Sequence, residues 1–405
     1  MVERVRLTII GGGVVGCAIA WQLSQKIDDL IVIEKNGSIK AENQSSRNSG
    51  VIHAGVYYPQ SISPLKAKLC VEGNRLLYTF CEQYDVPHTR VGKLILAANE
   101  DELPYLYDTV MLAEENGVPD VRVLTPSEAS EMEPNVHCVK AVLFPSSGVI
   151  EPSSLTYQLY TLASNQGAYF MLGNEVTQIR PIDGAFEITM QSGSQQEVFE
   201  TELLINSAGM NSDDVARMLQ PDFPFTIQPY RGESMQFVRS KRPEVDHFGM
   251  NVYPVPMPLN ANGVREAIPF DQFQRAFVEG KILKTVGVHL TPLLEIENHD
   301  YHLSAIVSVG PSSRFVSDKN DHSAPAFSRD HFHAQIQPIF PGLNADDLYF
   351  YQMGNQAKLK GHFDWVIQPD KNYPQCIHLV GIDSPGLTSC LAIAKYVEHM
   401  LGDSI

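Results

Sequence analysis

Residues 7–16, Leu7-Thr8-Ile9-Ile10-Gly11-Gly12-Gly13-Val14-Val15-Gly16, decide the fold of this 405-residue chain. The apolar, β-branched run 7–10 predicts a buried parallel strand. The glycines that follow it have the spacing G-x-G-x-x-G, and residues 17–23 have helical character. Residues 30–33 predict a second buried strand, and it ends at Glu34, 18 positions after Gly16. A strand, a glycine turn, a helix, a strand and a terminal acid are typical of a Rossmann-like dinucleotide-binding unit.

Each part of the glycine turn has a chemical purpose. Gly11 allows the tight turn, Gly13 lets the backbone approach a pyrophosphate, and Gly16 lets the helix pack closely on the strand. The helix begins near Val14 and Val15, where free N–H groups and the helix dipole favour phosphate. We therefore expect these residues to bind a cofactor that contains ADP.

The acid at the end of the second strand narrows the choice of cofactor. Glu34 can accept hydrogen bonds from both hydroxyls of the adenosine ribose, and we include the adjacent Lys35 in the expected site. An acid in place of a basic residue disfavours the 2′-phosphate of NADP. NAD and FAD both contain the ADP half and remain open at this point.

Three later segments favour FAD. Residues 44–58 form a polar, glycine-punctuated loop soon after the second strand, where an NAD enzyme usually starts another helix. Residues 203–211 predict a buried strand and a turn of small residues, with Asn211 or Ser212 capping a helix. Residues 377–388 predict a strand, a glycine loop and a C-terminal helix.

Four motifs in and near these segments resemble those of the D-amino-acid-oxidase-like FAD oxidoreductases. Residues 47–58, RNSGVIHAGVYY, and residues 384–388, SPGLT, are similar to signatures of the L-2-hydroxyglutarate dehydrogenases and their glycerol-3-phosphate-oxidising relatives within this group. Residues 253–256, YPVP, and 287–291, GVHLT, resemble two further elements. The resemblance extends over nearly the whole chain and implies FAD as the cofactor.

The resemblance also implies the fold class, which is α/β, or α+β over the whole chain. A Rossmann-like FAD-binding domain of the glutathione-reductase type is expected from residues 1–85, 145–215 and 340–405. An antiparallel-sheet substrate domain is expected from residues 86–144 and 216–339. Within it, residues 92–97 and 236–238 read as strands, and residues 312–328 read as a surface loop.

Where the resemblance places the cofactor, three regions surround it besides the glycine turn. The loop of residues 45–50 lies along the ribityl chain and the flavin, and residues 175–176 bracket adenine. The turn at 386–388 points N–H groups at the pyrimidine edge of the flavin, where negative charge develops on reduction. The expected cofactor-binding residues are Gly11, Gly13, Val14, Val15, Gly16, Glu34, Lys35, Ser46, Arg47, Asn48, Ser49, Gly50, Val176, Ala208, Gly209, Gly381, Gly386, Leu387 and Thr388.

The chemistry requires a base and an anion site. Oxidation of a 2-hydroxy acid removes the hydroxyl proton and passes the Cα hydride to flavin N5, and histidine is the natural base. The resemblance places His53 beside the flavin, so we expect it to be this base; a structural hydrogen bond to the cofactor or a covalent flavin link are the alternatives. His331 and His333 are expected to be structural or solvated.

Basic groups are needed to hold the substrate carboxylates. Arg231 matches an Arg-Gly element of the family, with a structural ion pair as the alternative, and Tyr253 and His289 are candidates for the pocket wall. The family segment GIRPKL corresponds here to a segment with Gln356 in place of the arginine. An uncharged amide cannot replace a guanidinium against a carboxylate, so Lys358 is expected to compensate in part.

The resemblance implies oxidation of L-2-hydroxyglutarate to 2-oxoglutarate. The electrons would pass to a quinone or another acceptor. An oxidase of glycerol-3-phosphate or of another small hydroxy or amino acid, using O₂, is the alternative within the same class. A flavin-binding protein that has lost turnover is the alternative outside it.

Composition excludes several other roles. Lys plus Arg number 30 against 47 Asp plus Glu, so the formal net charge is −17 and nucleic-acid binding is disfavoured. The six cysteines show no C-x-x-C pair and no zinc spacing, so no metal site is expected and a reducing cytoplasmic location fits. No apolar run is long enough to span a bilayer.

The segment between the motifs YPVP and GVHLT differs from the family, which usually has a short link there. About thirty residues, roughly 257–286, intervene in this chain. They suggest an inserted hairpin or helix, with a lid or a peripheral contact to the inner membrane as alternatives.

Overall fold

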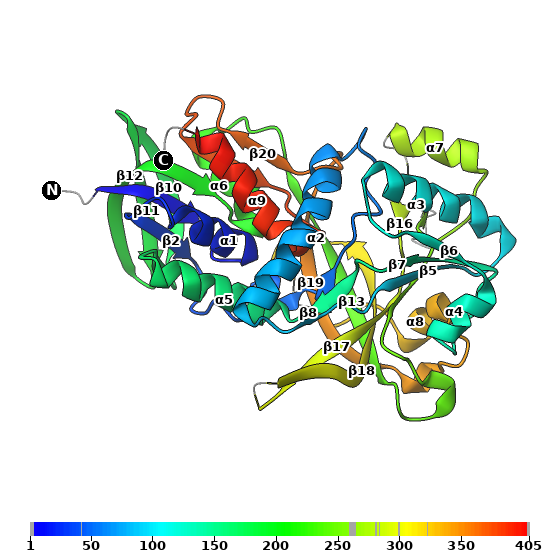
Figure 1. The fold of residues 1–405 in the computed structure, drawn as a ribbon. Coiled ribbons are helices and arrows are strands. Elements are labelled where there is room, and N and C mark those ends of the chain that lie inside the picture. The colour runs from blue at the N-terminus through cyan, green and yellow to red at the C-terminus, as the bar shows by residue number, and fades with distance from the viewer. Residues whose placement is uncertain are drawn as a thin grey trace.

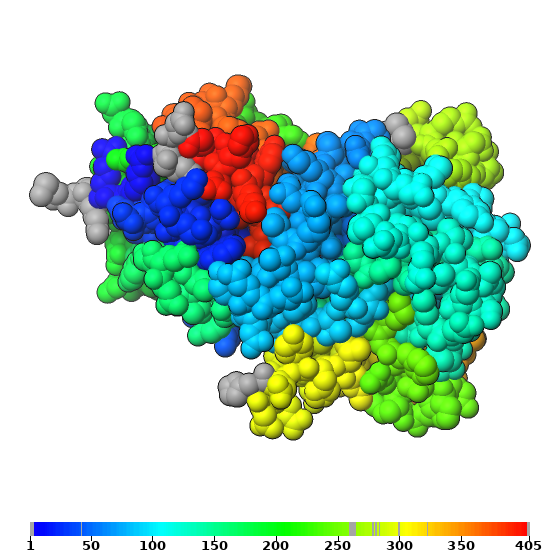
Figure 2. All heavy atoms as spheres, in the orientation of Figure 1, coloured from blue at the N-terminus to red at the C-terminus, as the bar shows by residue number. Residues whose placement is uncertain are grey.

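The computed structural model describes residues 4–41, 43–258, 265–279, 282, 284–298, 300–321 and 323–402. Two eight-stranded sheets lie side by side, each with its own helices (Figure 1). The long helix α2 (Pro64–Tyr84) lies between the two parts and occupies the middle of the face seen in Figure 2. No helix in the described part of the chain combines the length and the apolar character that crossing a membrane requires.

The first sheet is built on the N-terminal strand, as predicted. β1 (Arg4–Ile10) pairs in parallel with β2 (Leu30–Glu34) on one side and with β12 (Gln195–Asn206) on the other. β9 (Tyr169–Leu172) and β21 (Cys376–Val380) extend the parallel set at its two ends. Three antiparallel strands complete the sheet: β10 (Glu175–Ile182), β11 (Ala185–Ser192) and β20 (Val366–Pro369).

Helices cover both faces of this sheet. α1 (Val14–Leu23) packs against α5 (Pro152–Asn165) and α9 (Gly386–Leu401), and α9 also packs against α2. These helices and one face of the sheet form the largest buried cluster, which includes Leu7 and Val32. α6 (Ser212–Leu219) packs on β10 and β21 in a second cluster, where its Val215 joins strand residues that face the other way. Asn211 occupies the N-cap position of α6, as the sequence predicted.

The second sheet is largely antiparallel and has the order β19-β13-β18-β17-β14-β5-β7-β6. Its strands are β5 (Lys93–Ala97), β6 (Arg122–Leu124), β7 (Lys140–Phe144), β13 (Ile227–Val238), β14 (Asn251–Pro254), β17 (Leu290–Glu297), β18 (Asp300–Phe315) and β19 (Tyr349–Leu359). β5 and β13 confirm the two strands predicted at 92–97 and 236–238. β19 falls within the range 340–405 that was expected in the cofactor-binding domain, yet it pairs with β13 in this sheet.

Shorter elements surround the second sheet. Its helices are α3 (Leu103–Glu115), α4 (Pro126–Met132), α7 (Phe270–Val278) and α8 (Arg329–Ile336). β3 (Val51–Ile52), β4 (His88–Thr89) and β8 (Gly148–Ile150) form a small sheet, and β15 (Met257–Pro258) pairs with β16 (Lys284–Thr285). The division into two domains at the stated boundaries stays a prediction.

The expected surface loop and the expected inserted segment can both be compared with these elements. The surface loop expected over 312–328 is wrong at its start, because residues 312–315 belong to β18 and pair with β13. In the extra segment, Phe273 of α7 is buried against Tyr105 of α3, with ring centroids 5.2 Å apart, as expected for an inserted helix that packs on its neighbours. Residues 259–264, 280, 281 and 283 of that segment lie outside the described part of the chain.

Candidate active site

The glycine turn after β1 leaves no room for side chains. Gly11 has φ +104°, and a Cβ there would lie 2.4 Å from the carbonyl oxygen of Ser207, at the end of β12. A Cβ at Gly16 would lie 1.8 Å from the carbonyl oxygen of Gly11. α1 therefore sits close enough to the strand ends for its N-terminus to face a phosphate group.

Glu34 is buried at the end of β2 beside this turn. Its Oε2 accepts a hydrogen bond from the backbone N of Gly12 at 2.7 Å, and its Oε1 accepts one from the backbone N of Asn36 at 2.9 Å. Each carboxylate oxygen can accept a further bond, so the fixed carboxylate fits the two ribose hydroxyls of an ADP group. Lys35 points to the exposed side of the strand end.

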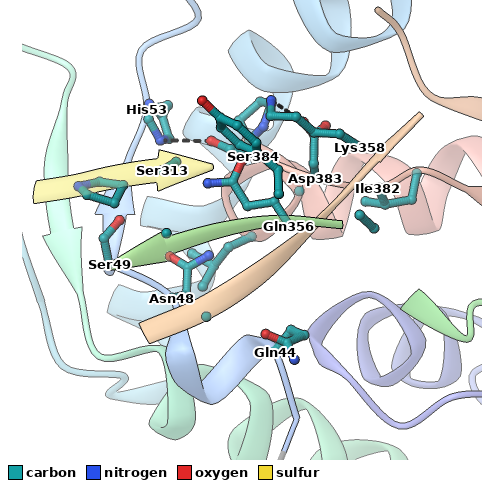
Figure 3. A pocket seen from close by; sticks show the side chains of 18 of the residues that line it. Gln44, Asn48, Ser49, His53, Ser313, Gln356, Lys358, Ile382, Asp383 and Ser384 are labelled. Carbon is teal, nitrogen blue, oxygen red and sulfur yellow. Dashed lines mark hydrogen bonds and ion pairs between the residues drawn. The ribbon is translucent and has the colours of Figure 1, made fainter. Parts of the chain in front are cut away.

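A cavity of about 450 Å³ lies between the glycine turn, the second sheet and the start of α9 (Figure 3). This volume is in the usual range for small-molecule sites. Fifteen of the predicted site residues line it: Gly13, Val14, Val15, Gly16, Arg47, Asn48, Ser49, His53, Gly209, Tyr253, His289, Gln356, Lys358, Gly386 and Leu387. Ten do not: Gly11, Glu34, Lys35, Ser46, Gly50, Val176, Ala208, Arg231, Gly381 and Thr388.

The loop after β2 is joined to distant parts of the chain. Ser45 Oγ accepts from the backbone N of Val14 at 2.9 Å, and Gln44 Oε1 accepts from the backbone N of Asn355 in β19 at 2.8 Å. Further along, the backbone N of His53 donates to Thr388 Oγ1 in α9 at 3.0 Å. These bonds connect the first turn of α1, both sheets and α9 around one cavity.

His53 lies on the cavity wall, where Figure 3 shows its ring facing Ser384. Its Nε2 is 3.3 Å from Ser384 Oγ, and its buried Nδ1 has no hydrogen-bond partner in the described part of the chain. Burial, with smaller contributions from the charges of Lys93 and His289, lowers the pKa of His53 well below its ordinary value. The imidazole is therefore neutral near pH 7 and can accept a proton.

Two aromatic rings, with a buried lysine behind them, form the wall next to His53. The ring of Tyr253 stacks on His289, with centroids 3.8 Å apart. Lys93 lies beneath it with Nζ 4.1 Å from the Tyr253 ring centroid, and this Nζ has no hydrogen-bond partner among the described residues. Burial lowers the pKa of Lys93 to about 7 and that of His289 to about 3. Tyr253 and His289, both predicted for the wall, thus lie together on it.

Arg231 is placed differently from its predicted role as a substrate anchor. Its side chain is fully buried behind the cavity wall in β13. The guanidinium is 3.2 Å from Glu233 and 3.0 Å from Asp321, and it donates to Ser323 Oγ at 2.7 Å. Protein acceptors thus occupy the guanidinium, which corresponds to the alternative of a structural ion pair.

Several residues that line the cavity were not singled out from the sequence. They are mainly Gln44, Tyr57, Tyr58, Lys66, Tyr230, Asp383 and Ser384. Ser384 belongs to the quoted SPGLT motif, so its position was available as a signal. Lys66 lies on α2 and had no signal, because only the packing of α2 on α9 brings it to the cavity.

The fold and the residues of the cavity fit an FAD-dependent oxidoreductase, and comparison with known proteins gives the same family. The family of FAD-dependent oxidoreductases matches residues 6–400, so this chain belongs to that family and is an enzyme that uses FAD. The structure resembles that of L-alpha-glycerophosphate oxidase from Mycoplasma pneumoniae with FAD bound, with a TM-score of 0.81 at 24% identity over 98% of this chain and 95% of that one.

Two relatives indicate the branch of the family to which the chain is similar. It is 31% identical to the mitochondrial L-2-hydroxyglutarate dehydrogenase of Arabidopsis thaliana over 98% of this chain and 83% of that protein. It is 26% identical to L-2-hydroxyglutarate dehydrogenase of Escherichia coli K12 over 96% of this chain and 91% of that one. These findings confirm the family, the fold class and the FAD cofactor predicted from the motifs.

Proposed function

We propose that this enzyme oxidises L-2-hydroxyglutarate to 2-oxoglutarate, with His53 as the base that takes the hydroxyl proton. The observation that carries the proposal is the neutral, buried imidazole of His53 on the cavity wall. A base must be unprotonated to act, and the lowered pKa keeps this ring unprotonated at neutral pH. The names of the relatives supply the substrate, and no further observation favours a second one.

The chain's own residues have three tasks in this reaction. His53 receives the hydroxyl proton, and Ser384 Oγ orients its ring at 3.3 Å. Tyr253 and His289, which are buried and stacked on each other, form one wall of the cavity that holds the substrate. Bound FAD supplies the two-electron acceptor, and Glu34 with the glycine turn holds its ADP half.

The electron acceptor that we propose is a quinone or another oxidant other than O₂, as the similarity to dehydrogenases suggests. Reoxidation of the photoreduced enzyme tests this part separately. We expect it to be slow in air-saturated buffer and fast with a soluble quinone. Rapid reoxidation by O₂ with release of hydrogen peroxide would instead make the enzyme an oxidase.

Anaerobic titration tests the substrate. Oxidised enzyme is mixed without O₂ with L-2-hydroxyglutarate, D-2-hydroxyglutarate, glycerol-3-phosphate or glycine, and the flavin absorbance is followed. We expect the L-2-hydroxy acid alone to bleach the flavin. Bleaching by glycerol-3-phosphate or glycine in its place would reassign the substrate, and a flavin that none of them reduces would support a binding protein without turnover.

A further inference from the structure

Three charged side chains meet on one side of the cavity, and they come from three distant parts of the chain. Lys66 belongs to α2, Lys358 to β19, and Asp383 to the turn between β21 and α9. Lys66 Nζ is 2.7 Å from Asp383 Oδ1, and Lys358 Nζ is 3.1 Å from Asp383 Oδ2. All three line the cavity.

In this cluster two lysine side chains share the one carboxylate of Asp383. Burial lowers the pKa of Lys66, and the charges of Asp383 and Asp364 oppose that shift. The Asp364 carboxylate accepts hydrogen bonds from the backbone N of Leu65 and of Lys66 at the start of α2, and it makes no ion pair with either lysine among the described residues. Burial opposes ionisation of Asp383, but the two ammonium groups lower its pKa, so the carboxylate is charged. Each ammonium has three N–H donors, and Asp383 is the one hydrogen-bonding acceptor for both in the described part of the chain. The side chains of Lys66 and Asp383 are only 9% and 3% exposed, so water screens their charges weakly.

The cluster lies beyond Ser384 as seen from the base. Figure 3 shows His53, Ser384, Asp383 and Lys358 following one another along the cavity. Ser384 contacts His53 at 3.3 Å, and its chain neighbour Asp383 contacts both lysines. The carboxylate on the reacting carbon must lie beside His53, whereas a carboxylate at the other end of the substrate can reach this cluster.

Gln356, next to the cluster on β19, carries no charge, so the lysines of the cluster have to supply the positive charge for a bound carboxylate. Gln356 and Lys358 are two residues apart on β19, so their side chains share one face, and both line the cavity. Gln356 can donate a neutral hydrogen bond, but it supplies no charge against an anion. In a chain of net charge −17, a dicarboxylate therefore needs the positive charge that Lys66 and Lys358 provide.

We propose that Lys66, Lys358 and Asp383 form a subsite for the distal carboxylate of the substrate and thereby select a dicarboxylate over a monocarboxylate. This inference rests on the proposed function, because it names how that substrate is recognised. Asp383 keeps both ammonium groups in place, and the N–H donors that Asp383 does not occupy bind the carboxylate. Lys66 is then a determinant of specificity that acts at the far end of the substrate from the base.

The test compares two substrates that differ only at this end. L-2-hydroxyglutarate carries the distal carboxylate, and its C5 amide is uncharged and of the same shape. In Lys66→Met we expect kcat/KM for the dicarboxylate to fall at least about 30-fold, as for loss of one member of a buried charge pair, and that for the amide to change less than about threefold. Lys68→Met is the matched control, because Lys68 is exposed on the same helix.

Binding of glutarate, followed by the flavin spectrum, gives a readout that does not need turnover. We expect a weaker complex in Lys66→Met, unchanged binding in Lys68→Met, and partial recovery in Lys66→Met/Asp383→Asn, where the Lys358 ammonium no longer shares its charge with Asp383. If Lys66→Met does not bind FAD, Lys358→Met tests the same cluster, because Lys358 is its more exposed member and its replacement disturbs the packing less.

Two results would overturn the subsite. One is an unchanged preference for the dicarboxylate in both Lys66→Met and Lys358→Met. The other is an equal loss for the dicarboxylate and the amide, which would make the cluster a structural ion pair. Failure of the proposed function looks different, because wild-type enzyme would then oxidise neither compound while the glutarate titration still reports on the cluster.

Discussion

Ser384 Oγ lies 3.3 Å from His53 Nε2, although the two residues are 331 positions apart in the sequence. The backbone N of His53 also donates to Thr388 in the first turn of α9. The loop that carries His53 is therefore attached at two points to the segment at the start of the last helix. This attachment determines the direction in which the imidazole faces and makes Ser384 a positioning residue.

Replacement of Ser384 by alanine should slow flavin reduction without removing FAD. Loss of one hydrogen bond of this kind is worth about 0.5–1.5 kcal/mol, so a fall of roughly 2- to 12-fold is expected. Rapid-mixing kinetics measures it. In His53→Ala, the further change Ser384→Ala should have almost no effect, because the ring that it orients is gone. Fully additive effects of the two changes would mean that Ser384 acts independently of His53.

The pH dependence of flavin reduction follows from the neutral state of His53. A base acts in its unprotonated form, and the pKa of His53 is lowered by burial and by the nearby charges of Lys93 and His289. The rate should therefore be constant around pH 7 and fall only in acid, below the ordinary histidine value of about 6.5. Lys93 itself loses its proton near pH 7, so the decisive variant is Lys93→Met, in which an activity that still rises between pH 7 and 9 would point to a different base.

Lys93→Met should shift this acid limb upward. The Lys93 charge lowers the pKa of His53, so its removal lets His53 take up a proton at higher pH. Lys140→Met, on the neighbouring strand β7, is the control, because no effect of Lys140 on His53 is expected. An acid limb that stays in place in Lys93→Met would show that the ammonium does not act on the base.

The same substitution should change stability. The pKa of Lys93 is about 7 in the folded protein, whereas an unfolded lysine has about 10.4. Between these values the unfolded state binds more protons, so the free energy of unfolding rises with pH. Lys93→Met removes that rise and should add about 2 kcal/mol or more at pH 7. Urea unfolding of the FAD-loaded enzyme at pH 7 and pH 9 measures both effects.

Gly16→Ala should abolish FAD binding and destabilise the first sheet. The added Cβ would lie 1.8 Å from the carbonyl oxygen of Gly11, so α1 would have to move away from the turn. Overpacking of this kind costs about 1–3 kcal/mol or more. Gly37→Ala is the control, because its Cβ would meet no atom within 4 Å. FAD content and melting temperature report the result, and a yellow, fully stable Gly16→Ala protein would contradict the cofactor site.

The sequence predicted well those parts of the protein that depend on local pattern. The strand, glycine turn and helix over residues 7–23 lie where expected, because apolar runs and glycine spacing encode them directly. The motif 384–388 likewise reaches the cavity. Asp383 was not singled out, although it directly precedes that motif.

The sequence could not predict contacts that arise only from packing. Lys66 and Lys358 meet at Asp383 because α2 packs on α9 and β19 pairs with β13. Arg231 looked like an anion anchor, since nothing local indicates that Ser323 and Asp321 would occupy its guanidinium. A charged residue in a motif indicates that a charge is needed at that position. Which groups pair with that charge follows only from the tertiary structure.

The most direct test of the proposed reaction is a single anaerobic turnover of wild-type enzyme and of His53→Ala with L-2-hydroxyglutarate. We predict that the wild-type flavin bleaches and that one equivalent of 2-oxoglutarate forms per FAD. His53→Ala should keep its FAD and its visible spectrum while flavin reduction slows by about 10²–10⁴-fold, the usual contribution of a positioned general base. Equal rates in the two proteins, or a wild-type flavin that stays oxidised, would contradict the proposal.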